Sequence, residues 1–278
     1  MSCGQRCGSE FKRPMFDIEE NEGSLDINAS FHIGKGLLSV VGIIKFITFA
    51  IAVVSLVYSF TVIEIPSFYP AFLTPWTVFF GILQLGGSWI LTAFYSKDGS
   101  IYNPQNKNVL VKITWLLYSV AGVIGCCITI LFWGAVYDPD NPSNDMFDKI
   151  MTHGGVVAIV LLQGNLLDRV PMRLKHIAFS DGLAVIFSIW LALQNTVIKY
   201  NPNIDDDDDA IYDAMKWRTE TTSAIIQTVL VIVLVVPLFQ TILWAVSLPK
   251  RRYLVEEVYD VDKGEVQEKP ADQEEGHV

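Results

Sequence analysis

Six long apolar blocks, separated by polar connectors, dominate the pattern of the chain. They cover residues 36–63, 72–95, 109–137, 150–167, 176–198 and 223–248. About 20 apolar residues in a helix cross the ~30 Å hydrocarbon core of a bilayer, and a single apolar block in lipid satisfies its own backbone hydrogen bonds only as a helix. A soluble all-α core is the alternative, but several blocks are apolar around the whole helix circumference. The pattern predicts an all-α fold, a polytopic transmembrane bundle of six helices.

Composition divides the chain into three segments. Hydrophobic residues make up 51% of the 278 residues and charged residues 18%, yet the formal net charge is −10. The charges must therefore gather outside the apolar blocks. We expect a cytoplasmic amino-terminal segment at 1–35, a six-helix membrane domain at 36–248 and an acidic, disordered cytoplasmic tail at 249–278. The excess of 30 acidic over 20 basic residues excludes a basic nucleic-acid binder.

Charge in the connectors predicts the orientation. Lys and Arg gather before the first block, between the second and third, between the fourth and fifth, and after the sixth. Basic residues flanking the spans mark the cytoplasmic side, so both termini are expected to be cytoplasmic, in the plasma membrane or the endoplasmic reticulum. The five aspartates at 205–209 then lie on the opposite side. They lack the spaced ligands and glycine of a calcium loop, so we expect a solvated loop.

Thr74 and His153 form the first candidate site. Thr74 opens the second block and His153 lies about one turn into the fourth, and both blocks descend from the same side. At a common depth, a hydroxyl and an imidazole could act as a nucleophile and its base. Alternatively, they are a threonine bonded to its own backbone and a histidine at the boundary, which is the commoner arrangement.

Lys45 and Asp181 form a second pair at matched depth. Each lies several residues into its block from the predicted cytoplasmic side. An unpaired charge in lipid is costly, so we expect these two side chains to pair or to share a polar pocket. An internal salt bridge and a proton or ion relay would use the same residues.

No cofactor or metal is expected from the motifs. Cys3 and Cys7 are too few for a structural zinc site. The chain has no phosphate-binding glycine loop, nucleophile elbow or zinc-binding His-Glu-x-x-His motif.

Four short motifs resemble the rolling-stone family of multi-pass membrane proteins, which is associated with myoblast fusion in insects. They are Phe-Leu-Thr-Pro-Trp at 72–76, Phe-Trp-Gly at 132–134, Thr-His-Gly-Gly at 152–155 and Arg-Val-Pro-Met-Arg-Leu-Lys-His at 169–176. The resemblance covers about residues 30–255. The chain departs from the family at Pro75 and at Gly155, where the family commonly has Asn.

The chain is more distantly similar to the androgen-induced family of six-helix membrane hydrolases, which cleave fatty-acid esters of hydroxy fatty acids. This resemblance implies an intramembrane threonine and histidine, which correspond here to Thr74 and His153. Trp76, Gln227 or a backbone N–H could donate to the oxyanion.

Three functions remain open from the sequence. The first is a non-enzymatic role in cell-surface interaction or fusion, with an unidentified protein partner. The alternative is a threonine-nucleophile esterase that takes lipid esters from the bilayer through Thr74 and His153. A transporter or channel is the third.

The orientation predicts that Asn28 carries no sugar. Asn28-Ala29-Ser30 is an acceptor motif, but a cytoplasmic asparagine does not meet the glycosylation machinery. We expect peptide N-glycosidase to leave the electrophoretic mobility of the full chain unchanged after expression in glycosylating cells. A mobility shift that Asn28→Gln abolishes would reverse the orientation.

Overall fold

The computed structural model describes residues 39–63, 65–94, 109–137, 145–168, 172–201, 210–212 and 215–247. Within these residues the protein is all-helical, and six helices are long and apolar enough to cross a membrane. The predicted six-helix membrane fold is thereby confirmed. The expected terminal segments, the Asn28 motif and the aspartates at 205–209 lie outside the described residues.

The six spans match the six apolar blocks closely. They are Val40–Val62, Leu73–Ala93, Val109–Gly134, Met146–Leu167, Leu174–Ile198 and Thr221–Ser247. The third span is the most enclosed by protein, whereas the first and sixth expose most of their apolar side chains. In a membrane those exposed side chains contact lipid, so the protein contacts the bilayer on both flanks of the bundle.

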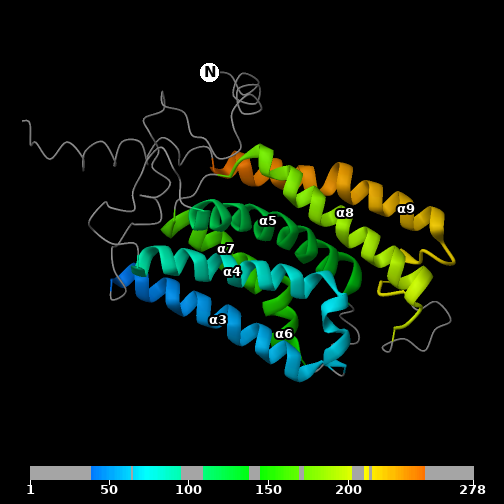
Figure 1. Ribbon diagram of the computed structural model, residues 1–278, viewed down its shortest axis with the longest axis horizontal. Coiled ribbons are helices and arrows are strands. Elements are labelled where there is room, and N and C mark those ends of the chain that lie inside the picture. The colour runs from blue at the N-terminus through cyan, green and yellow to red at the C-terminus, as the bar shows by residue number, and fades with distance from the viewer. Residues whose placement is uncertain are drawn as a thin grey trace, which may run out of the picture.

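The first three spans are built from long α-helices. Helix α3 (Val40–Val62) begins after Ser39, whose side chain accepts a hydrogen bond from the Gly42 amide. A 3₁₀ segment, η2 (Pro66–Ala71), turns the chain into α4 (Leu73–Phe94). Helix α5 (Val109–Leu131) returns and ends in a π-helical turn, η3 (Phe132–Val136). Helix α4 contacts both α3 and α5, as Figure 1 shows.

The fourth span contains two π-helical segments. It runs through α6 (Met146–Ile150), η4 (Met151–Gly155), α7 (Val156–Leu162) and η5 (Gln163–Leu167). A π-helical turn inserts one extra residue and rotates the side chains that follow it. The fourth span therefore presents its polar residues at angles that an uninterrupted α-helix would not give.

The last two spans lie side by side across one flank of the bundle (Figure 1). The fifth consists of η6 (Leu174–His176), α8 (Ile177–Leu193) and η7 (Gln194–Ile198). The sixth begins with α9 (Thr221–Leu230) and η9 (Val231–Val235) and continues to Ser247. Helix α8 contacts α5 and η9, which connects this pair to the centre of the bundle.

Glycines let the central helices approach closely. A Cβ on Gly125 of α5 would lie 2.4 Å from Val157 Cγ2, and one on Gly164 would lie 2.1 Å from Tyr118 Cε2. No real Cβ atom tolerates such distances. The contact between α5 and the fourth span therefore requires glycine at both positions, as is common where membrane helices pack tightly.

One face of α4 carries buried polar residues along its whole length. Residues three or four positions apart share a helix face, and the stripe consists of Thr74, Thr77, Gln84, Ser88 and Thr92, all buried. Its first member belongs to the candidate Thr/His site. Its last two members bind an ion pair at the other end of the bundle.

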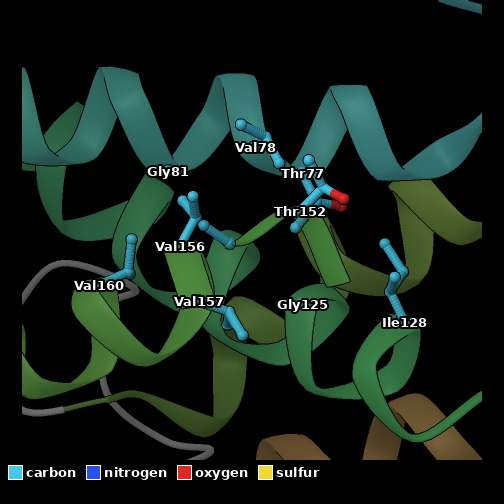
Figure 2. Close-up of a pocket in the computed structure, with 10 residues that line it drawn as sticks. Thr77, Val78, Gly81, Gly125, Ile128, Thr152, Val156, Val157 and Val160 are labelled. Carbon is cyan, nitrogen blue, oxygen red and sulfur yellow. The ribbon is translucent and has the colours of Figure 1, made fainter. Parts of the chain in front are cut away.

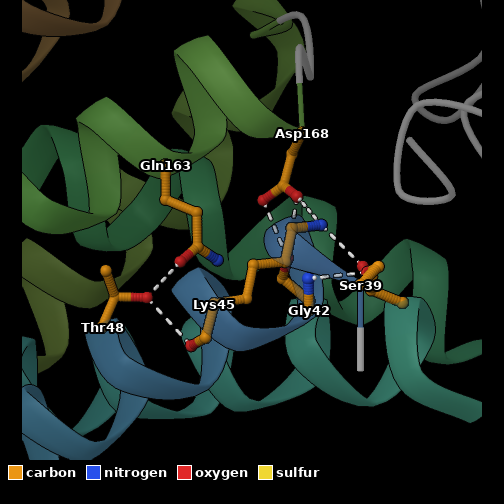
Figure 3. A network of polar contacts seen from close by, with 8 residues as sticks. Ser39, Gly42, Lys45, Thr48, Gln163 and Asp168 are labelled. Atoms are coloured by element: carbon orange, nitrogen blue, oxygen red, sulfur yellow. Dashed lines mark hydrogen bonds and ion pairs between the residues drawn. The ribbon is translucent and has the colours of Figure 1, made fainter. Parts of the chain in front are cut away.

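That ion pair joins Lys45 of α3 to Asp168, directly after η5 (Figure 3). Both side chains are fully buried. Lys45 Nζ also donates to Thr92 Oγ1 at 2.7 Å, and Ser88 Oγ lies 2.9 Å from each oxygen of the Asp168 carboxylate. One turn away, Thr48 Oγ1 donates to Gln163 Oε1 at 2.5 Å. The network thus ties α3, α4 and the fourth span together.

The predicted pairing of Lys45 with Asp181 needs correction, because the carboxylate bound to Lys45 is that of Asp168. Asp181 lies on α8, and its Oδ1 atom has no hydrogen-bond partner among the described residues. Asp168 follows the last apolar residue of its block, a position typical of a solvated connector. The packing of α3 and α4 against η5 encloses it instead.

The ion pair predicts that removing the charge of Asp168 destabilises the protein much more than removing that of Asp181. We expect Asp168→Asn to lower the free energy of unfolding by roughly 3–5 kcal/mol, since it leaves the Lys45 ammonium buried without its counter-charge. Asp181→Asn serves as the matched control and should cost little. Thermal unfolding in detergent, followed by thiol-reactive dye at the free Cys126 and Cys127, measures both.

The double substitution Lys45→Met with Asp168→Leu should recover most of the stability lost in Asp168→Asn. Equal effects of Asp168→Asn and Asp181→Asn would contradict the pairing of Lys45 with Asp168.

Candidate active site

Thr74 lies in the first turn of α4, at a corner held by aromatic side chains from distant segments. The Leu73 amide donates to Tyr212 Oη at 3.2 Å, and Trp190 Nε1 of α8 donates to the Ala71 carbonyl at 3.0 Å. Burial raises the pKa of Tyr212 to about 12, so its hydroxyl stays protonated at physiological pH. These contacts fix where α4 begins and, with it, the depth of Thr74.

His153 lies in the π-helical segment η4. Its own backbone departs from helical geometry, with φ −103° and ψ 16°. Successive residues of an α-helix point about 100° apart, but here Thr152 and His153 are hydrogen-bonded to each other and both approach the start of α4. Local distortions of this kind are frequent at functional sites.

The structure brings the two predicted residues together. Thr74 Oγ1 lies 3.3 Å from His153 Nε2, and Thr74 is only 9% exposed. The sequence could match their depths, but the contact also requires α4 and the fourth span to be neighbours, which they are. A hydroxyl within hydrogen-bond reach of an imidazole nitrogen is the geometry that a nucleophile and its general base need.

The partners of the other ring nitrogen assign the tautomer of His153. Nδ1 lies 2.9 Å from Thr152 Oγ1 and 3.3 Å from the Lys149 carbonyl oxygen. The carbonyl can only accept, and the Thr152 hydroxyl already donates its proton to the Asp148 carbonyl at 2.8 Å. Nδ1 therefore carries the proton, and Nε2 presents its lone pair to Thr74. This is the tautomer in which a histidine accepts a proton from a nucleophile.

Phe132 packs against one face of the imidazole ring. Its ring stacks on that of His153 with 3.6 Å between centroids and 22° between planes. Phe132 begins the π-helical end of the third span. Three spans thus build the site: the second supplies the hydroxyl, the fourth the imidazole, and the third a wall that restricts rotation of the ring.

A small cavity lies one helical turn beyond the Thr/His pair. It has a volume of about 10 Å³ and lies between α4, α5 and the fourth span. Figure 2 shows Thr77 and Thr152 close together, with Ile128 to one side of them and Val156 and Val160 to the other. Apart from those two threonines, its lining is valine, glycine, alanine and isoleucine.

Sequence inspection missed several residues of the site. Thr152 stands beside His153, but its role depends on the η4 distortion, which no pattern in the sequence signals. The sequence shows Phe132 in the Phe-Trp-Gly motif but does not indicate that its ring contacts His153. Of the two proposed side-chain donors to the oxyanion, Trp76 Nε1 already donates to the Pro70 carbonyl, and Gln227 Nε2 donates one of its two protons to Ser223 Oγ on its own helix. Amides of the first turn of a helix lack partners within that helix. In α4 the Leu73 amide is bound to Tyr212 and Pro75 has no N–H, so the amides of Thr74 and Trp76 are the backbone candidates.

The described residues contain no cluster of three or more His, Cys, Asp or Glu side chains that could hold a metal ion.

Comparison with known proteins leaves the site to be interpreted from its own geometry. No protein-family model matches the chain, and no curated protein or solved structure matches it either. The resemblance to the rolling-stone and androgen-induced families thus rests on the short motifs alone, and what the structure establishes is a multi-pass membrane protein with six candidate spans.

Proposed function

We propose that the protein is a membrane-embedded hydrolase of lipid esters, with Thr74 as nucleophile and His153 as general base. The single observation that carries this proposal is the approach of Thr74 Oγ1 to His153 Nε2, the imidazole nitrogen without a proton. A role in surface interaction or fusion does not require a buried hydroxyl to face an imidazole acceptor. The pairing therefore favours hydrolysis over the non-enzymatic alternative.

Acylation follows from this geometry. Thr74 Oγ attacks the ester carbonyl carbon while its proton passes to His153 Nε2. The imidazolium then protonates the departing alkoxide oxygen, the carbon–oxygen bond of the ester breaks, and the acyl group remains on Thr74. Contacts of the Nδ1 proton with Thr152 Oγ1 and the Lys149 carbonyl hold the ring in place and favour its charged form during the transfer.

Deacylation uses the same residues in the reverse order. Water gives a proton to His153 Nε2 as its oxygen attacks the acyl carbon, and the proton then returns to Thr74 Oγ as the carboxylic acid leaves. Both residues lie near the end of the bundle where α4 begins, so the required water reaches them from the nearby aqueous boundary. The ester itself comes from the bilayer, whose lipids contact the exposed spans.

An active-site probe tests the pair directly. We expect a fluorescent fluorophosphonate to label the full chain in detergent, because the probe reacts with a hydroxyl activated by a neighbouring base. Thr74→Ala and His153→Ala should each abolish labelling, whereas Thr74→Ser retains the nucleophile and should keep it. In-gel fluorescence measures the result.

Thr241→Ala is the matched control, since Thr241 is exposed and bonded only to its own helix at Pro237. A single gel-filtration peak for each variant excludes misfolding as the cause of lost labelling. The proposal is wrong if labelling persists in both Thr74→Ala and His153→Ala, or if neither the unaltered protein nor any variant is labelled. Thr74 and His153 would then have structural roles only.

Thr152 should act as a positioning residue for His153. Thr152→Val removes the nearer of the two acceptors of the Nδ1 proton while keeping the side-chain shape, and one hydrogen bond is worth about 0.5–1.5 kcal/mol. We expect kcat for a chromogenic ester to fall roughly two- to tenfold with KM unchanged, and Thr152→Ser to restore it. A rise in KM alone, or a loss that serine does not rescue, would show that Thr152 only packs against its neighbours.

A further inference from the structure

The cavity beside the Thr/His pair extends along the same two spans that supply the pair. Thr77 and Gly81 lie three and seven residues beyond Thr74, while Val156 and Val160 lie three and seven beyond His153. At 1.5 Å per residue, these four residues lie about 4.5 to about 10.5 Å beyond the level of the pair, towards the interior of the bundle. Thr74 itself does not line the cavity, but an acyl group on Thr74 Oγ that extends towards the interior of the bundle would point to it.

The lining suits an apolar group better than water. The Thr77 hydroxyl donates to the Leu73 carbonyl and the Thr152 hydroxyl to the Asp148 carbonyl, so neither has a proton left to donate. The other lining side chains carry no polar atom. A buried water needs two to four polar partners. The two threonine oxygens can act only as acceptors and supply no more than that minimum, whereas an apolar group needs no such partner.

The valines of the fourth span limit the size of the cavity. A volume of about 10 Å³ holds roughly one water-sized group. A Cβ on Gly81 would lie 3.1 Å from Val156 Cγ1 and 3.2 Å from Val160 Cγ2. The space thus exists because residue 81 is glycine, and it ends where those two valines meet α4.

We propose that this cavity receives the acyl group of the ester and limits it to a short chain, so that the substrates are membrane lipids with an acetyl-sized ester group. This inference rests on the proposed function of Thr74 and His153. The larger alcohol portion of the lipid remains outside the cavity, where the exposed helix faces contact the bilayer. The acid released is a short carboxylic acid that leaves through the nearby aqueous boundary.

A chain-length series on the full chain in detergent tests the inference. The substrates are the p-nitrophenyl esters of acetate, butyrate, octanoate and laurate, with the Thr74→Ala rate subtracted as background. Each methylene that a pocket must accept or reject changes kcat/KM roughly tenfold or more, so we expect kcat/KM to fall at least tenfold from acetate to octanoate. Val160→Ala and Val156→Ala should each raise the octanoate rate at least tenfold, and Gly81→Ala should lower the butyrate rate by a similar factor.

Gly182→Ala is the matched control, because a Cβ there meets nothing within 4 Å. It should leave the whole series unchanged. A Thr74-dependent series that favours laurate, or one that Val160→Ala, Val156→Ala and Gly81→Ala all leave unaltered, would overturn the inference while sparing the hydrolase. If no ester in the series is cleaved in a Thr74-dependent manner, the hydrolase itself is wrong and the inference falls with it.

Discussion

The interior of a bilayer offers no water to polar groups, so a charged side chain there needs a partner supplied by the protein. Lys45 and Asp168 meet this requirement with each other and with the hydroxyls of Ser88 and Thr92. The pair connects three spans at one end of the bundle. Because separation would leave two charges without compensation, it strongly restricts how α3, α4 and the fourth span can shift.

The contacts between α4 and the fourth span extend from the ion pair to the other end of the bundle, so they restrict helix movement there as well. Helix α4 presents Thr92 and Ser88 to the ion pair and Thr74 to His153, while the fourth span supplies both Asp168 and His153. The two helices are thus fixed together at two levels. The candidate site between them is therefore held by two packed helices.

Distortion within the fourth span separates the residues of the ion pair from those of the candidate Thr/His site. The turn at η5 precedes Asp168, and the turn at η4 contains Thr152 and His153. Between them, α7 is regular and packs its valines against Gly81 and Gly125. Regular helix therefore forms the cavity wall, while each π-helical turn redirects polar side chains at one end of it. This division explains how a largely apolar span can contribute to two polar sites.

Aromatic side chains complete the arrangement at the start of α4. Tyr69 Oη and Ser59 Oγ lie 2.6 Å apart and connect η2 to α3, and burial raises the pKa of Tyr69 to about 12, which keeps it uncharged. Tyr212 and Trp190 hold the following turn from the opposite flank. Thr74 is thereby positioned by residues far from it in sequence.

The sequence alone determined the six spans, because bilayer thickness and the cost of unpaired backbone groups leave long apolar blocks one conformation. It also indicated that Thr74 and His153 share a depth, since depth follows from counting residues along a helix. Which helices become neighbours is decided by side-chain packing, which depth does not encode. For this reason the sequence made Asp181 a plausible partner for Lys45, whereas in the structure the packing of η5 places Asp168 beside Lys45. The proton on Nδ1 of His153 likewise depends on Thr152 and the Lys149 carbonyl, whose positions only the tertiary structure fixes.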